Sequence, residues 1–278
     1  MTTDRPDSDQ IISIQDGVSN STIVSGNGNV VKNYYTDPSS TSNINSQNRL
    51  PSRSESKFEY RSRSALLAEV KSVWIEGILK KSLCNQVLIE LNLEKRSKAA
   101  AFLLRGVEDF RDVAQSLPKG TQAIDVFTAL GPGRTLLILG EPGAGKTTTL
   151  LKVTQSLIER IGDDVSQLIP VVFQLSSWSE KDKAFADWLI QELQGNPYNL
   201  RRNIAVNLIA QEQLTLCLDG LDEVAVQHRQ SCLAALNQFI HSHGITEIVI
   251  CSRVKEYEAL AKKLHVRDAI FVQPLTSK

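Results

Sequence analysis

The chain has 278 residues, and its 31 Lys and Arg balance its 31 Asp and Glu, so the formal net charge is zero. A balanced charge argues against a dedicated nucleic-acid binder and against a protein held on anionic membranes. The polar N-terminus lacks the apolar segment of a signal peptide, and no later run approaches the length of a membrane span, so we expect a cytoplasmic protein.

The first region, residues 1–57, is rich in Ser, Asn, Asp and Thr and is predicted to be mostly disordered. Within it, residues 11–33 place short β-branched runs between Asp16-Gly17 and a tandem Gly-Asn turn, which is typical of a hairpin or β-arch. Its apolar area is too small for a stable monomeric unit, so stacking against copies of itself is one interpretation. The alternative is a disordered tail with incidental valines.

Apolar residues recur at three- and four-residue intervals across residues 58–119, which predicts a helical segment ahead of the main domain. The pattern begins around Leu66 and Trp74 and continues in the sets Leu83–Leu93 and Ala99–Ala114. Basic side chains here alternate with acidic ones and no aromatic ladder accompanies them. We therefore interpret them as a solvated helix face rather than a nucleic-acid patch.

Across residues 120–278, apolar strands alternate with amphipathic helices. This alternation predicts an α/β fold, with a parallel sheet that carries helices on both faces and a ligand at the carboxyl ends of its strands. The five candidate strands are Thr135–Leu139, Pro170–Leu175, Leu214–Leu218, Glu247–Cys251 and Ile270–Gln273.

A phosphate-binding loop follows the first of these strands. Residues Gly140–Thr147 read GEPGAGKT, a full match to G-x-x-x-x-G-K-[ST] between an apolar strand and a helical pattern. The glycines let the backbone curl so that N–H groups point at phosphate oxygens, and the lysine reaches the β and γ phosphates. The threonine hydroxyl is suited to Mg²⁺. We assign phosphate binding to Gly140, Glu141, Pro142, Gly143, Ala144, Gly145, Lys146, Thr147 and Thr148.

Hydrolysis also needs a metal carboxylate and a group that orients water, and the run LCLDGLDE contains both. Asp219 ends an apolar strand, so we predict that it and Thr147 hold Mg²⁺. Glu223, supported by Asp222, is predicted to orient the attacking water. The alternative is a strand followed by a solvated acidic turn.

Another strand ends in Arg253, which at that edge of the sheet would face the γ phosphate and report its presence. The alternative is an ion pair between Arg253 and Glu256 or Glu258 on the next helix.

Four stretches together resemble a NACHT domain, of the signal-transducing branch of P-loop ATPases called STAND proteins: GEPGAGKTTTL, PVVFQLSSW, LCLDGLDEV and IVICSRVKEYE. The resemblance runs from about Gly120 to the C-terminus. The helical segment with Trp74 looks like the one that precedes NACHT domains in bacterial, notably cyanobacterial, members. The paired acidic residues that follow the strand-ending aspartate are the most discriminating part of this resemblance.

By that resemblance, the chain would be a signalling switch in microbial defence that is closed with ADP, assembles into a homo-oligomer with ATP, and resets by slow hydrolysis. Residues 11–33 resemble the amyloid-type signalling motifs that precede some such switches and would be the effector. The sequence stops at Lys278, before the helical lid, winged helix and sensor repeats of NACHT proteins. A partner polypeptide could supply them, and the alternative function is a non-hydrolysing assembly adaptor or a fragment of a split protein.

The predicted ligands are a nucleotide and Mg²⁺. No N-K-x-D guanine-reading motif occurs in the sequence, which favours ATP, with GTP as the alternative. Neither a nucleic acid nor a membrane is expected as a partner.

Overall fold

The computed structural model describes residues 53–84, 93–95, 115–118, 120–162, 167–179 and 184–273. All of them belong to one unit, Arg53–Lys278. The predicted stacking segment, residues 11–33, lies outside the described part of the chain, and so do residues 96–114 of the predicted helical segment.

Seven strands of the described residues form one sheet in the order β2-β1-β7-β3-β6-β5-β4. The five strands from β7 to β4 are parallel, while β1 pairs antiparallel with both β7 and β2. Each predicted strand is present within two residues of its expected bounds, which confirms the predicted fold class. The strands are β1 Leu93–Lys95, β2 Gln115–Ser116, β3 Thr135–Gly140, β4 Ile169–Gln174, β5 Leu214–Asp219, β6 Glu247–Arg253 and β7 Asp268–Val272.

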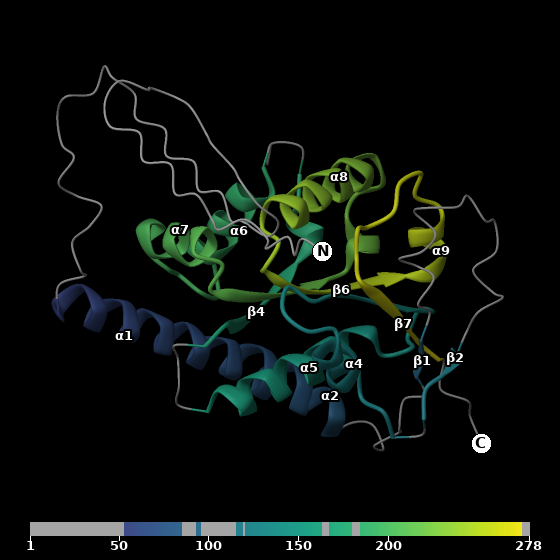
Figure 1. The fold of residues 1–278 in the computed structure, drawn as a ribbon, viewed down its shortest axis with the longest axis horizontal. Coiled ribbons are helices and arrows are strands. Elements are labelled where there is room, and N and C mark those ends of the chain that lie inside the picture. Colours follow the sequence, from purple (N-terminus) through teal and green to yellow (C-terminus); the bar gives the residue numbers. More distant parts are fainter. Residues whose placement is uncertain are drawn as a thin grey trace, which may run out of the picture. The chain divides into compact units, whose positions relative to one another are not determined.

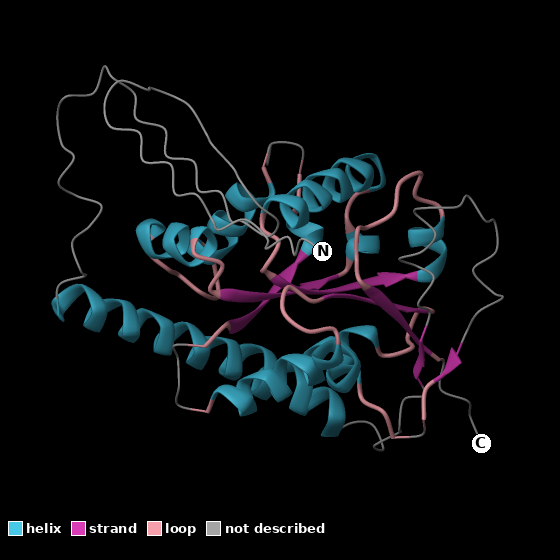
Figure 2. Ribbon diagram, viewed as in Figure 1, coloured by secondary structure: helices cyan, strands magenta, loops and turns pink. Residues whose placement is uncertain are grey.

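Helices cover both faces of the sheet (Figures 1 and 2). One layer holds α1, α2, α4 and α5, and the other holds α6, α7 and α8 (Figure 1). No helix in the described part of the chain combines the length and the apolar character needed to cross a membrane. The helices are α1 Arg53–Val70, α2 Lys80–Cys84, α4 Ala123–Ala129, α5 Lys146–Ile161, α6 Phe185–Gln194, α7 Arg202–Ala210, α8 Val226–Ser242 and α9 Val254–Glu258, with shorter turns η3 Leu175–Ser177 and η4 Leu221–Glu223.

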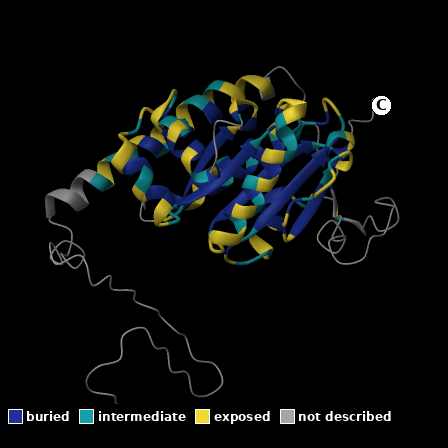
Figure 3. Cartoon of the chain, turned by 90° about the horizontal axis from the view of Figure 1, so that it is seen from above, coloured by how far each residue is buried: buried dark blue, intermediate teal, exposed yellow. Residues whose placement is uncertain are grey.

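The hydrophobic core lies on both sides of the central strands, which are buried along almost their whole length (Figure 3). Strand β3 is buried at all six positions, and β6 at its first six. The interior positions of these strands, Leu136–Leu139 and Ile248–Cys251, alternate between two covered faces and are apolar, which is why they read as continuous hydrophobic runs in the sequence. The helices bury one stripe and expose the other.

The N-terminal helix packs directly against the sheet. Helix α1 continues into a π-helical stretch, η1 Lys71–Leu79, which contacts α5, while α1 contacts β4. The indole Nε1 of Trp74 donates a hydrogen bond of 2.9 Å to the Tyr198 hydroxyl, which in turn donates to the carbonyl of Val172 on β4. Because β4 is the edge strand of the described sheet, this chain of bonds satisfies a carbonyl to which no neighbouring strand donates.

The region ahead of β3 departs from the helical prediction at β1 and at β2, which both lie within residues 58–119. Leu93, the last residue of a predicted helical set, begins β1 instead, where it is buried opposite Val272. Pairing along the edge of β7 overrides the local helical pattern, because it satisfies backbone groups that the sheet would otherwise leave unpaired. Helix α1 also begins at Arg53, within the segment assigned to the tail.

The Tyr198 hydroxyl gives a test of this docking. We expect Tyr198→Phe to lower the free energy of unfolding by about 1–3 kcal/mol, because it leaves the buried Trp74 Nε1 and the Val172 carbonyl without partners. Urea unfolding followed by circular dichroism measures the change. The matched control is Tyr60→Phe at an exposed ring, for which we expect a change within about 0.5 kcal/mol. Equal effects of the two substitutions would contradict the docking role of Tyr198.

Candidate functional site

The loop between β3 and α5 adopts the conformation that the glycines predict. Gly143 and Gly145 have φ values of 75° and 93°, in the left-handed region that side-chain-bearing residues rarely adopt. The Ala144 N–H donates to the Glu141 carbonyl at 3.1 Å and closes the turn. The chain therefore reverses tightly at the carboxyl end of a buried strand, which is where ligands bind in open parallel sheets.

Gly140 is required for close packing rather than for an unusual φ. A Cβ at this position would lie 3.0 Å from the Val272 carbonyl and 3.3 Å from both the Ala144 Cβ and the Lys146 Cγ. The backbone of the loop is therefore held against β7, and a side chain at Gly140 would push it out of place.

Positive charge gathers where α5 begins. The N–H groups of its first turn have no acceptor within the helix, and the helix dipole adds partial positive charge at the same point. The Lys146 ammonium lies back across the loop and donates to the carbonyls of Gly140 and Glu141 at 3.2 and 3.0 Å. Backbone N–H donors, a helix N-terminus and a lysine ammonium together form a site that suits a polyphosphate.

Two oxygen groups meet beside this loop. The Thr147 hydroxyl on α5 donates to Asp219 Oδ2 at the tip of β5, at 2.9 Å. A carboxylate and a hydroxyl oxygen are hard ligands, and Mg²⁺ in nucleotide sites takes one or two protein oxygens beside those of phosphate and water. The pair therefore fits Mg²⁺, with Thr147 and Asp219 as the residues that would hold it.

The carboxyl of Asp219 lies in an electrostatically unfavourable place. Its partial burial raises its pKa, and the nearby Glu223 and Asp222 carboxylates raise it further. The Thr147 hydroxyl and the Lys146 ammonium act in the opposite direction without cancelling the rise. A raised pKa means that the ionised form of the carboxyl is disfavoured in this environment. A bound cation would stabilise that ionised form, so the site favours one.

The acidic turn after β5 separates its two carboxylates. Gly220 has φ 75° and lets the chain turn sharply into η4, whose last residue, Glu223, is exposed. The Asp222 side chain, in contrast, is only 5% exposed and is bonded to Arg253: its Oδ1 accepts from the backbone N–H and its Oδ2 accepts from Nε, both at 2.9 Å. Arg253 also lies 3.8 Å from Glu256 Oε1, so one expected partner is present, but the shorter contacts are to Asp222.

Sequence reasoning missed Arg229, which braces the same turn from α8. Its guanidinium donates to the carbonyl of Asp222 at 2.6 Å and to that of Val224 at 3.1 Å. The only sequence signal was an arginine one turn into the helix that follows the acidic motif. The turn is thus held through its backbone by Arg229 and through the Asp222 side chain by Arg253.

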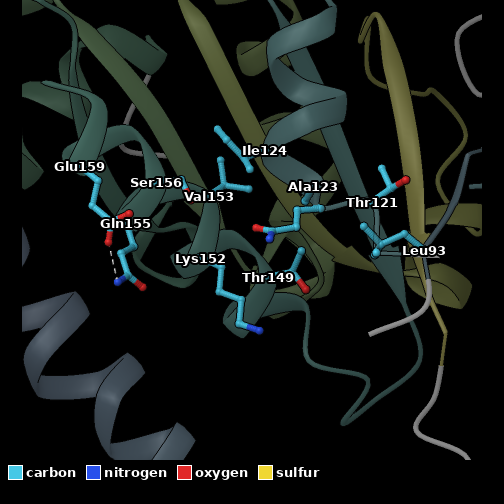
Figure 4. Close-up of a pocket in the computed structure, with 12 residues that line it drawn as sticks. Leu93, Thr121, Ala123, Ile124, Thr149, Lys152, Val153, Gln155, Ser156 and Glu159 are labelled. Atoms are coloured by element: carbon cyan, nitrogen blue, oxygen red, sulfur yellow. Dashed lines mark hydrogen bonds between the residues drawn. The ribbon is translucent and has the colours of Figure 1, made fainter. Parts of the chain in front are cut away.

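A cavity of about 380 Å³ adjoins the loop along α5, and it too was not anticipated (Figure 4). Residues 121–124, which lead into α4 and form its first turn, line one wall, and Leu93 of β1 contributes to the lining. Thr149, Lys152, Val153 and Ser156 line the other wall, on consecutive turns of α5. Its lining combines polar side chains such as Thr149 and Lys152 with apolar ones such as Ile124 and Val153. Its only sequence signal was the continuation of polar residues along α5 beyond the loop.

The raised pKa of Asp219 predicts that its ionised carboxylate lowers the stability of the nucleotide-free protein. We expect Asp219→Asn to raise the Tm of the nucleotide-free protein at pH 7.5, because the ionised carboxylate destabilises the fold. The gain should shrink as the pH falls toward about 4, where an aspartate is protonated even in the unfolded chain. Thermal unfolding in EDTA across this pH range measures it. A lower Tm for the variant at pH 7.5, or a gain that does not change with pH, would contradict the account.

Comparison with known proteins identifies a family for the second half of the chain. A search of curated proteins found no match. Among solved structures, one that matches is titled "Structure of C. elegans PCH-2", at 18% identity and a TM-score of 0.31, with 51% of this chain and 36% of that chain covered. The NACHT domain profile matches residues 134–277, more than half of the chain and the part that contains the loop, the acidic turn and Arg253. The chain therefore belongs to the NACHT domain family, whose members are nucleotide-binding P-loop NTPases.

Proposed function

We propose that the chain is a NACHT-type signalling switch that binds ATP with Mg²⁺, hydrolyses it slowly and couples its nucleotide state to self-assembly. The observation that carries the proposal is the 2.9 Å hydrogen bond between Thr147 and Asp219. It joins the phosphate loop on β3 to the acidic tip of β5, so the groups for phosphate and for metal converge on one point.

The loop residues Gly140–Thr148 hold the phosphates in this proposal. Lys146 leaves its two carbonyl partners for the β and γ phosphates, which are stronger acceptors because they are charged. The cavity beside α5 accepts the base and ribose, since Thr149 lines it directly after the last loop residue. A bound Mg²⁺ would neutralise charge that develops on the phosphates during hydrolysis.

Glu223 is the general base of the proposed reaction. Its exposed carboxylate is close enough to Asp219 to raise that residue's pKa, so it lies beside the metal position. It accepts the proton of the attacking water while the water oxygen bonds to the γ phosphorus and the bond to ADP breaks. Asp222 cannot share this role directly, because Arg253 engages both of its oxygens.

The wider role belongs to the same proposal. Assembly on ATP binding would bring residues 11–33 of several chains together and raise their local concentration. The second candidate, a nucleotide-binding adaptor without turnover, is favoured by the exposure of Glu223, because a water-activating carboxylate usually works in a closed site.

Lys146→Ala tests nucleotide binding. We expect ATP affinity to fall by at least about a hundredfold, because two charge-assisted contacts to phosphate are lost. The far-UV circular dichroism should stay unchanged, since the ammonium bonds only to loop carbonyls. Isothermal titration calorimetry with Mg·ATP measures the affinity, and Lys262→Ala at an exposed position is the control. Retained affinity in Lys146→Ala would refute the role of the loop.

Glu223→Gln separates the enzyme from the adaptor. We expect phosphate release to fall by about a hundredfold or more while ATP still binds, because the amide cannot accept the proton from water. Glu258→Gln, an exposed carboxylate on α9, is the matched control and should keep the wild-type rate. Equal background rates in the wild type and Glu223→Gln would eliminate hydrolysis and leave the adaptor.

A further inference from the structure

Arg253 lies directly beside the start of the phosphate loop. It is the last residue of β6, and in the parallel register of β6 with β3 it pairs with Gly140. An arginine at this position has its backbone fixed by the sheet. Its side chain is 42% exposed, so the orientation of the guanidinium depends on what binds it.

Asp222 binds Arg253 at two points that fix this orientation. One carboxylate oxygen accepts the backbone N–H, and the other accepts Nε, each at 2.9 Å. A rigid carboxylate that bridges the backbone and the Nε of one residue restrains the torsions between them. The terminal Nη groups lie beyond the bridged segment, and Nη1 has only a long contact of 3.8 Å to Glu256.

Asp222 is itself held in place, so it can restrain the Arg253 side chain that it binds. Its side chain is only 5% exposed. The Glu223 N–H donates to the Gly220 carbonyl at 2.9 Å, and Arg229 bonds to the carbonyls of Asp222 and Val224. Gly220 has a φ of 75°, in the left-handed region that side-chain-bearing residues rarely adopt, so a side chain at this position would strain the turn.

We propose that Asp222 is a positioning residue: it holds the Nε edge of Arg253 so that the terminal Nη groups meet the γ phosphate of a nucleoside triphosphate. The pair would thereby set the preference for triphosphate over diphosphate, with Asp222 acting only through Arg253. This inference rests on the proposed nucleotide-binding function. It deepens the role of Asp222, whose buried carboxylate is unsuited to binding water directly.

The test is the ratio of the dissociation constants for ADP and a non-hydrolysable ATP analogue, measured by calorimetry with Mg²⁺ on the full chain. We expect Asp222→Asn to lower the wild-type ratio by about tenfold or more, since an amide nitrogen cannot accept from Nε and a charge-assisted bond is lost. The loss should fall on the triphosphate, because ADP lacks the γ phosphate. Glu256→Gln, which removes the same charge at the longer contact, is the control and should change the ratio by less than about twofold.

A double-mutant cycle tests whether Asp222 acts through Arg253. We expect Arg253→Gln to lower the ratio as Asp222→Asn does, and the double variant to be no worse than Arg253→Gln alone. Additive losses would overturn the inference. Arg253→Lys keeps the charge but lacks Nε, so it should also lose the preference for triphosphate over diphosphate. If Asp222→Asn fails to fold, Arg253→Lys tests the role of the Nε contact in its place. A full wild-type ratio in Arg253→Lys would overturn the clamp.

The outcomes separate this inference from the proposed function. If the wild type binds no nucleotide, both fail. If the wild type prefers triphosphate and Arg253→Gln removes that preference while Asp222→Asn keeps it, the nucleotide site stands and the clamp alone is refuted.

Discussion

The strand order is the constraint on which the whole site depends. Strand β6 lies between β3, which leads into the phosphate loop, and β5, which ends at Asp219. The bond from Thr147 to Asp219 therefore passes over the end of β6, where Arg253 lies. The residues that we propose for phosphate binding, metal binding and phosphate sensing follow three adjacent strands, because parallel strands end at one edge of the sheet.

This convergence brings several carboxylates close together, which is electrostatically unfavourable. Asp219 is partly buried among other carboxylates, and its pKa is raised in consequence. The surrounding structure over-determines the arrangement: Arg229 and Arg253 hold the acidic turn, and the packing at Gly140 holds the loop against β7. A ligand that brings a divalent cation would relieve the repulsion, so binding and local stability are linked.

The five parallel strands and the loop were predictable because their signals are local. Continuous apolar runs such as Leu136–Leu139 reveal a strand covered on both faces, and the loop motif occupies consecutive residues. The contacts between distant residues were not predictable. Asp222 and Arg253 are 31 positions apart and Trp74 and Tyr198 are 124 apart, so each pairing depends on strand order and on side-chain direction. The cavity beside α5 could not be predicted from the sequence for the same reason, because three separate elements line it.

The most direct test of the central claim is the effect of Mg²⁺ on ATP affinity in the wild type and in Thr147→Val, a variant of nearly the same shape without the hydroxyl. Calorimetry on the full chain, with Mg²⁺ and then with EDTA, gives the four dissociation constants. The account predicts that Mg²⁺ tightens wild-type binding by about tenfold or more, and that Thr147→Val removes most of that gain. Equal affinity with and without Mg²⁺ in the wild type would contradict it.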